Sequence, residues 1–232
     1  MTRDARLPLP VLAGITAGLF AIAIALIFFY APVDSGSAQS QGLSQKIFYF
    51  HVPIALTAYA AFGWGAWKAL RYLWKRNEDS DLESYVALHQ GVIFGTLTLV
   101  TGSIWARISW GVWWVWGDDE LVLFLVLFLF YCAYFMLRFS VDPGVARANM
   151  SAVYALCGIV LLPISFFAIR LSRSIIHPEV FTLHGPQMTH SQFIAFCVSY
   201  VAMLFLFVTL YRLELAGKRL DIQLREIREL LA

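Results

Sequence analysis

The chain has 232 residues, of which 60% are hydrophobic and only 14% are charged, and its mean hydropathy is +0.70. A soluble domain carries about 25% charged residues, so this composition excludes an ordinary soluble globular protein. The formal net charge of +2 excludes no class by itself. The three cysteines, Cys132, Cys157 and Cys197, all lie inside apolar runs and indicate small buried side chains rather than a disulfide framework.

Apolar runs divide the chain into six expected transmembrane helices, since a membrane-spanning helix needs roughly 20 apolar residues. In chain order we expect them over residues 9–30, 47–72, 85–104, 120–137, 150–169 and 192–211. The first run exceeds the apolar core of a signal peptide, so we expect it to be retained. Polar loops are expected at 31–46, 75–84, 105–120, 138–149 and 170–191. The predicted fold class is an all-α polytopic membrane protein, with a six-helix domain over residues 1–212.

A charged segment over residues 213–232 follows the last apolar run. Four apolar residues in it are spaced to form one stripe on a helix: Leu220, Leu224, Ile227 and Leu231. We therefore expect a cytoplasmic amphipathic tail. It either lies on the inner membrane surface or extends the sixth helix, and the alternative is a helix that binds a partner.

The distribution of lysine and arginine predicts how the helices are oriented, because basic loops stay on the cytoplasmic side. Twelve basic residues lie in the segments on one side: Arg3, Arg6, Arg71, Lys75, Arg76, Arg138, Arg147, Arg212, Lys218, Arg219, Arg225 and Arg228. The other side has four: Lys46, Arg107, Arg170 and Arg173. Both termini are therefore expected in the cytoplasm, with the segments 105–120 and 170–191 on the outer face.

Tryptophans are concentrated in residues 105–120, between the third and fourth expected helices. Five of the eight lie there: Trp105, Trp110, Trp113, Trp114 and Trp116. Tryptophan is enriched at membrane interfaces, so an anchoring belt is one interpretation. So dense a cluster exceeds what anchoring requires. An aromatic shelf at the membrane surface suits a large, flat, apolar ligand with charged edges, such as haem.

Histidines near this shelf are candidate ligands of haem iron, which commonly takes an imidazole nitrogen as axial ligand. His51 lies at the outer end of the second expected helix, and His184 precedes Gly185-Pro186. Each can instead be an ordinary hydrogen-bonded histidine. His177 and His190 lie in or beside the same outer segment and are further candidates, whereas His89 is expected at the opposite end in a structural role.

Charged residues of the outer face offer two further roles. Three arginines can pair with haem propionates or with lipid headgroups: Arg107, Arg170 and Arg173. Three acids can orient a histidine or a tryptophan N–H, or stabilise the start of the fourth helix: Asp118, Asp119 and Glu120. For Glu120 we favour the capping role.

Several motifs together resemble the WWD domain of haem-handling proteins in cytochrome c biogenesis, and most closely the short, six-helix CcmC type. The tryptophan motif is Thr101-Gly-Ser-Ile-Trp105 followed by Trp110-Gly-Val-Trp-Trp-Val-Trp116. Tyr49-Phe-His51-Val-Pro53 and Thr182-Leu-His184 are similar to the flanking histidine motifs, and residues 131–138 also match. The resemblance spans roughly residues 45–212. One departure is that Trp116 is followed by Gly117, where the family has Asp, and the family's basic residue and Thr beyond it are missing.

This resemblance implies a function, a cofactor and partners. It implies that haem b is held non-covalently on the shelf at the outer face of the cytoplasmic (inner) membrane, with His51 and His184 as axial ligands. Trp105, Trp110, Trp113, Trp114, Trp116, Asp118 and Arg107 would complete the site. The haem would be presented to a periplasmic chaperone of the CcmE type, alongside an ABC transporter of the CcmAB type and a small CcmD-type membrane protein. Lipid is the remaining expected partner, and no nucleic acid is expected.

Alternative functions stay open at this point. A cytochrome c synthase of the same superfamily would attach haem covalently to an apocytochrome, but it usually has more helices and a large outer domain. A b-type electron-transfer protein would hold its histidine pairs at bilayer depth. A small-molecule transporter would show broken helices or charges at the midplane. We favour binding and delivery over catalysis, with no catalytic residue assigned.

Overall fold

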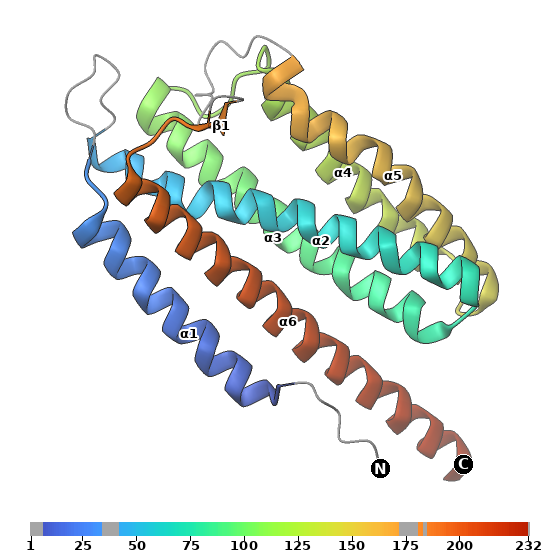
Figure 1. Cartoon of the computed structure of the whole chain (residues 1–232). Coiled ribbons are helices and arrows are strands. Elements are labelled where there is room, and N and C mark those ends of the chain that lie inside the picture. The colour runs from blue at the N-terminus through green and yellow to red at the C-terminus, as the bar shows by residue number, and fades with distance from the viewer. Residues whose placement is uncertain (1–6, 34–41, 172–180, 183–184, 232) are drawn as a thin grey trace.

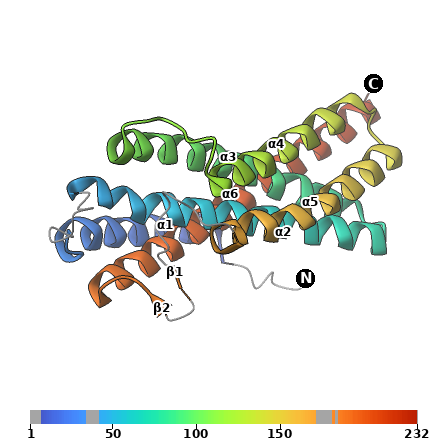
Figure 2. The same cartoon turned by 90° about the horizontal axis from the view of Figure 1, so that it is seen from above.

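The computed structural model describes residues 7–33, 42–171, 181–182 and 185–231. Its main elements are six α-helices (Figure 1): α1 Leu9–Ala25, α2 Phe48–Lys75, α3 Glu78–Trp110, α4 Asp119–Ser140, α5 Val145–Leu171 and α6 His190–Leu231. A π-helical turn, Leu26–Tyr30, continues α1, and a 3-10 helix, Gly42–Ile47, precedes α2. Two short strands, β1 Phe181–Thr182 and β2 Gly185–Pro186, pair antiparallel beside the start of α6 (Figure 2).

All six helices are long and apolar enough to cross a membrane, which confirms the predicted multi-pass all-α fold. Successive helices alternate in direction (Figure 1). The start of α1 and the end of α6 therefore share one end of the bundle, which we call the termini end. The loop between α3 and α4, the start of α2 and the β1–β2 pair share the opposite end, which we call the tryptophan end.

The prediction of a loop over residues 75–84 was wrong, because α3 already begins at Glu78. Asn77 is its N-cap, and the Asn77 side chain accepts a hydrogen bond from the backbone N–H of Asp79 at 2.8 Å. Asp79 and Asp81 in the first turn also favour a helix start at this point. Only Arg76, in the left-handed conformation with φ of 51°, and Asn77 separate α2 from α3.

Two further helix ends differ from the prediction. The C-terminal end of α3 is at Trp110 rather than residue 104, so Trp105 and Trp110 belong to a helix and the connecting loop shrinks to residues 111–118. The first residue of α5 is Val145 rather than residue 150. The other predicted transmembrane helices agree with the structure within a few residues.

The segment after residue 212 continues α6 without a break to Leu231. The tail was expected either to lie on the membrane surface or to extend the sixth helix, and the structure shows the extension. The side chains of the predicted apolar stripe, Leu220, Leu224, Ile227 and Leu231, are all exposed on this extension. The cytoplasmic location of the tail stays a prediction.

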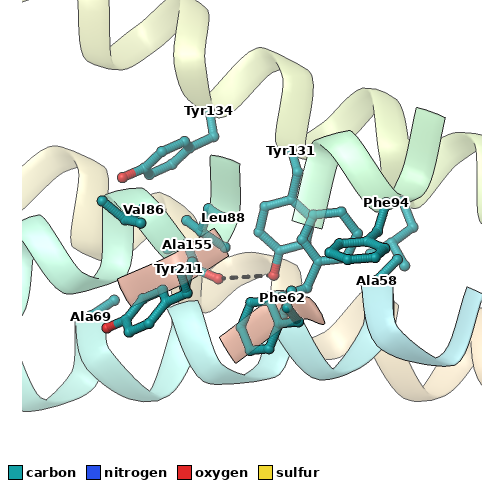
Figure 3. Packing of buried hydrophobic residues seen from close by; sticks show 14 of the residues in the cluster. Ala58, Phe62, Ala69, Val86, Leu88, Phe94, Tyr131, Tyr134, Ala155 and Tyr211 are labelled. Atoms are coloured by element: carbon teal, nitrogen blue, oxygen red, sulfur yellow. Dashed lines mark hydrogen bonds between the residues drawn. The ribbon is translucent and has the colours of Figure 1, made fainter. Parts of the chain in front are cut away.

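The core of the bundle lies between α2, α3, α4, α5 and α6, and it contains many aromatic rings (Figure 3). The ring of Phe62 stacks on that of Tyr131 with a centroid distance of 4.2 Å and an interplanar angle of 8°. Gly91 makes this packing possible, because a Cβ there would lie 2.5 Å from the Phe62 ring. Helix α1 lies along α6 (Figure 1), and Thr16 and Thr209 join the two helices through their hydroxyls at 2.8 Å.

Ion pairs and hydrogen bonds hold the helices together at the termini end. The Arg138 guanidinium donates to both carboxylate oxygens of Asp81, at 2.8 and 2.6 Å, which joins α4 to α3. Nδ1 of His89 lies 2.8 Å from the Glu214 carboxylate, which joins α3 to α6. Charges inside a membrane protein are costly unless they are paired, and these pairs meet that requirement. The contact of His89 agrees with the structural role expected for it.

Candidate functional site

His51 lies in the first turn of α2, at the tryptophan end, and its imidazole points to α3. Its Nδ1 is 2.9 Å from the hydroxyl oxygen of Thr101. That hydroxyl lies 2.7 Å from the carbonyl oxygen of Leu97, to which it donates its own hydrogen. The Thr101 oxygen is therefore placed to accept a hydrogen bond from Nδ1–H of His51. This arrangement favours the neutral tautomer whose Nε2 carries the lone pair.

Gly102 sets how close this imidazole comes to α3. A Cβ at Gly102 would lie 2.8 Å from Cε1 of His51 and 3.6 Å from each ring nitrogen. Any larger residue would push the ring away, so the absence of a side chain at Gly102 is what permits the observed position. Thr101 and Gly102 thus orient and seat the same histidine.

A pocket opens beside His51, between α2, α3, the first turns of α4 and the connecting loop. It encloses about 520 Å³ of space, its open mouth included. Its lining is mostly aromatic and apolar, and it also includes one imidazole, that of His51, and one carboxylate, that of Glu120. A flat, largely apolar ligand suits such walls.

The five tryptophans lie partly in the connecting loop and partly on α3. Trp113 and Trp114 line the pocket, and the ring of Trp116 meets that of Trp114 at a centroid distance of 5.9 Å and an angle of 65°. Trp105 and Trp110 instead pair within the last turns of α3, with a centroid distance of 5.1 Å. They contribute no lining to the pocket. Trp113 and Trp116 are 60% and 74% exposed, so the outer edge of the pocket is an open aromatic surface.

The acidic residues after the tryptophans lie at the start of α4, where they have different roles. Asp118, not Glu120, is the N-cap of α4, and its carboxylate accepts a hydrogen bond from the backbone N–H of Leu121 at 3.2 Å. Asp118 is buried. Glu120 lies in the first turn and lines the pocket together with His51. Glu120 therefore lies at the helix start, where its charge favours the helix, but the N-cap itself is Asp118 rather than Glu120. Asp119 lies in the same turn without lining the pocket.

Several other predicted site residues do not line the pocket or lie outside the residues that the structure describes. The guanidinium of Arg107 donates to the carbonyl oxygen of Gly111, where the loop begins. His190 is the exposed first residue of α6. His184 lies outside the described residues, between β1 and β2 in sequence. The same holds for His177, Arg173 and the side chain of Arg170.

Tyr59 is a pocket residue that the sequence analysis did not identify. Its hydroxyl lies 2.7 Å from that of Ser165 on α5, and this contact holds the ring in place. Residues 51, 55 and 59 all line the pocket. Their spacing of four places them on one face of α2, and this periodicity from His51 is the signal that could have identified Tyr59.

The residues of the pocket fit haem. Nε1 of Trp114 is buried and has no hydrogen-bond partner among the described residues, so a ligand with an acceptor group can satisfy it. Within the described part of the chain, no group of three or more His, Cys, Asp or Glu is placed to hold a metal ion. A single imidazole in an aromatic pocket suits an iron whose other ligands come from a macrocycle.

Comparison with known proteins identifies the family. The sequence profile of the CcmC family, described as Heme exporter protein C, matches residues 2–231. Heme exporter protein C of Bradyrhizobium diazoefficiens is 33% identical over 96% of this chain and 81% of its own length. That of Paracoccus denitrificans is 30% identical over 88% and 82%. A putative cytochrome c biosynthesis ccmC-like mitochondrial protein of Marchantia polymorpha is 28% identical over 88% and 85%.

These matches cover nearly the whole chain and agree with the six-helix fold. They imply a role in haem export or delivery for cytochrome c biogenesis. The chain belongs to the CcmC family of haem exporter proteins.

Proposed function

We propose that the protein holds haem b non-covalently in the pocket at the tryptophan end and presents it to a haem chaperone during maturation of c-type cytochromes. The observation that carries this proposal is the imidazole of His51, which Thr101 orients at an aromatic pocket walled by Trp113 and Trp114. An imidazole whose Nδ1 is hydrogen-bonded offers Nε2 to a metal, and the outer partner fixes its orientation. Bound haem would supply the iron that coordinates Nε2 of His51.

The proposed ligand set extends beyond the pocket residues. The resemblance to the family supports His184 as the second axial ligand. Nε1 of Trp114, which has no hydrogen-bond partner among the described residues, supports a donor role toward a propionate. Arg107 already donates to Gly111, so for this arginine we propose a role in positioning the loop rather than a first contact with propionate.

Delivery would occur at the exposed edge of the pocket, where Trp113 and Trp116 are open to a partner. The twelve-to-four distribution of basic residues supports placing this edge on the periplasmic side of the inner membrane. The family supports a CcmE-type chaperone as recipient, and a CcmAB-type transporter and a CcmD-type protein as further partners. Gly117, where the family has Asp, is the position at which contact with the chaperone would differ.

The test is the absorption spectrum of the detergent-purified full chain, loaded with haem, in oxidised and reduced form. His51→Ala and His184→Ala are compared with the wild type, and His190→Ala is the matched control, because His190 is an exposed histidine at the same end. We expect the Soret band to weaken or shift in the first two variants and to stay unchanged in the control. Equal spectra for wild type and His51→Ala would contradict the proposed ligand, and a wild type that binds no haem would contradict the function.

A further inference from the structure

A second pocket lies at the termini end, far from the tryptophan end, and its lining is mainly cationic. It encloses about 700 Å³, its open mouth included, between α3, the end of α4, the start of α5 and α6. Four basic side chains line it: Arg138, Arg147, Lys218 and Arg225. One carboxylate, that of Asp221, faces them, and the remaining lining is apolar or aromatic. The proposed haem function uses none of these residues.

The positive charge of this pocket is only partly neutralised within the protein. Arg138 is paired with Asp81, and Nζ of Lys218 lies 4.0 Å from the Glu214 carboxylate. Both cations also lie 5.0 Å from the centre of the Tyr85 ring, so two like charges share one aromatic ring. Arg147 and Arg225 make no ion pair or hydrogen bond with any described residue. Gathering cations in one hollow is costly unless an anion joins them.

The apolar lining indicates what kind of anion fits. Tyr85 and Phe139 form one wall, with their ring centroids 6.3 Å apart. Phe139 is 68% exposed, and Met136, one turn earlier on α4, is 75% exposed, so an exposed apolar surface continues from the pocket along α4. A free phosphate makes no favourable contact with an apolar surface, whereas an acyl chain packs against it. Arginine forks bind phosphate oxygens well.

We propose that this pocket binds the phosphate headgroup of an anionic membrane phospholipid, with its acyl chains along Met136 and Phe139. Basic pockets between transmembrane helices at the headgroup level suit such lipids. Arg147 and Arg225 contact the phosphate. Arg138 and Lys218, which both lie over the Tyr85 ring, add positive charge beside it. The bound lipid joins α4 and α5 to the extended part of α6.

The test is binding of phosphatidylglycerol to the detergent-purified full chain, followed by native mass spectrometry, with phosphatidylcholine as the neutral comparison. The variant is Arg147→Gln with Arg225→Gln, which removes two charges that have no partner in the described structure and so leaves the fold intact. The matched control is Lys75→Gln with Arg228→Gln, which removes the same charge outside the pocket. We expect phosphatidylglycerol binding to fall roughly tenfold or more in the variant and to stay unchanged in the control.

Three results would overturn the proposal. One is equal binding of phosphatidylglycerol and phosphatidylcholine to the wild type. Another is equal loss in variant and control, which would mean that overall charge rather than the pocket attracts the lipid. The last is displacement of the lipid by millimolar inorganic phosphate, which would make the pocket a site for a soluble phosphate.

Discussion

The imidazole of His51 lies against the backbone of Gly102, and a Cβ at that glycine would be 2.8 Å from Cε1 of the ring. No substitution at Gly102 leaves this histidine where it is. The contact comes from α2 and α3, which have the central place in the bundle, so the position of the proposed iron ligand depends on the packing of two membrane-spanning helices. A substitution at Gly102 can therefore displace the imidazole without mutating His51 itself.

Gly102→Ala is expected to lower haem affinity by roughly tenfold, because the displaced imidazole loses its alignment with the pocket. The fold should tolerate the change, since the atom met by the new methyl belongs to a side chain that can move. Haem titration followed at the Soret band gives the affinity, and thermal unfolding gives the stability. Gly63→Ala is the control, because a Cβ at Gly63 has nothing within 4 Å. Unchanged haem affinity in Gly102→Ala would contradict the claim that the position of His51 against Gly102 matters for haem binding.

Thr101→Val is expected to weaken haem binding by about tenfold, because the isosteric side chain cannot accept the hydrogen bond from Nδ1–H of His51. Thr101→Ser keeps the hydroxyl and should restore most of the affinity. Haem titration provides the comparison, and the reduced spectrum shows whether the axial ligand has changed. If valine and serine behave alike, the hydroxyl does not orient the histidine.

The sequence predicted the number of helices and the end of the bundle at which His51 meets the tryptophans. Both follow from apolar run lengths and from the distribution of arginine and lysine, which depend on the membrane rather than on packing. The start of α3 was missed because the acids in residues 78–84 looked solvated. In the structure Asp81 pairs with Arg138 and Glu83 with Lys68, and such partners, distant along the chain, cannot be identified from one sequence.

The candidate site was predicted only in part for the same reason. His51, Trp113 and Trp114 do come together at one pocket, whereas Trp105 and Trp110 stay on α3. Local spacing did not reveal that α3 continues through them until Gly111, with φ of 77°, ends the helix. The roles of Thr101 and Gly102 could not be inferred because they act on His51, which lies 50 and 51 positions away along the chain, although both belong to the motif that indicated the family.

Asp118→Ala is expected to destabilise the protein by about 1 kcal/mol, because the backbone N–H of Leu121 loses its cap. The loop 111–118 ends at this cap, so Trp113 and Trp114 should also become more mobile. Thermal unfolding measures the first effect, and quenching of tryptophan fluorescence by iodide measures the second. Asp119→Ala is the control in the first turn, and it should change both quantities less than Asp118→Ala.

Arg138→Gln is expected to destabilise the bundle by about 3–5 kcal/mol, because it leaves the carboxylate of Asp81 without its partner in a mostly buried position. Asp81→Asn should have a comparable effect, since it leaves the guanidinium unpaired. The double variant should lose less stability than the sum of the two single variants, because neither charge then remains alone. Unfolding in mixed micelles at increasing denaturant measures all three.

Haem affinity should change little in these variants, because Asp81 and Arg138 lie at the end of the bundle opposite His51. A loss of stability together with retained haem binding would show that the two ends of the bundle act independently. Strictly additive effects of the two substitutions would instead mean that the Arg138–Asp81 pair contributes no coupling energy.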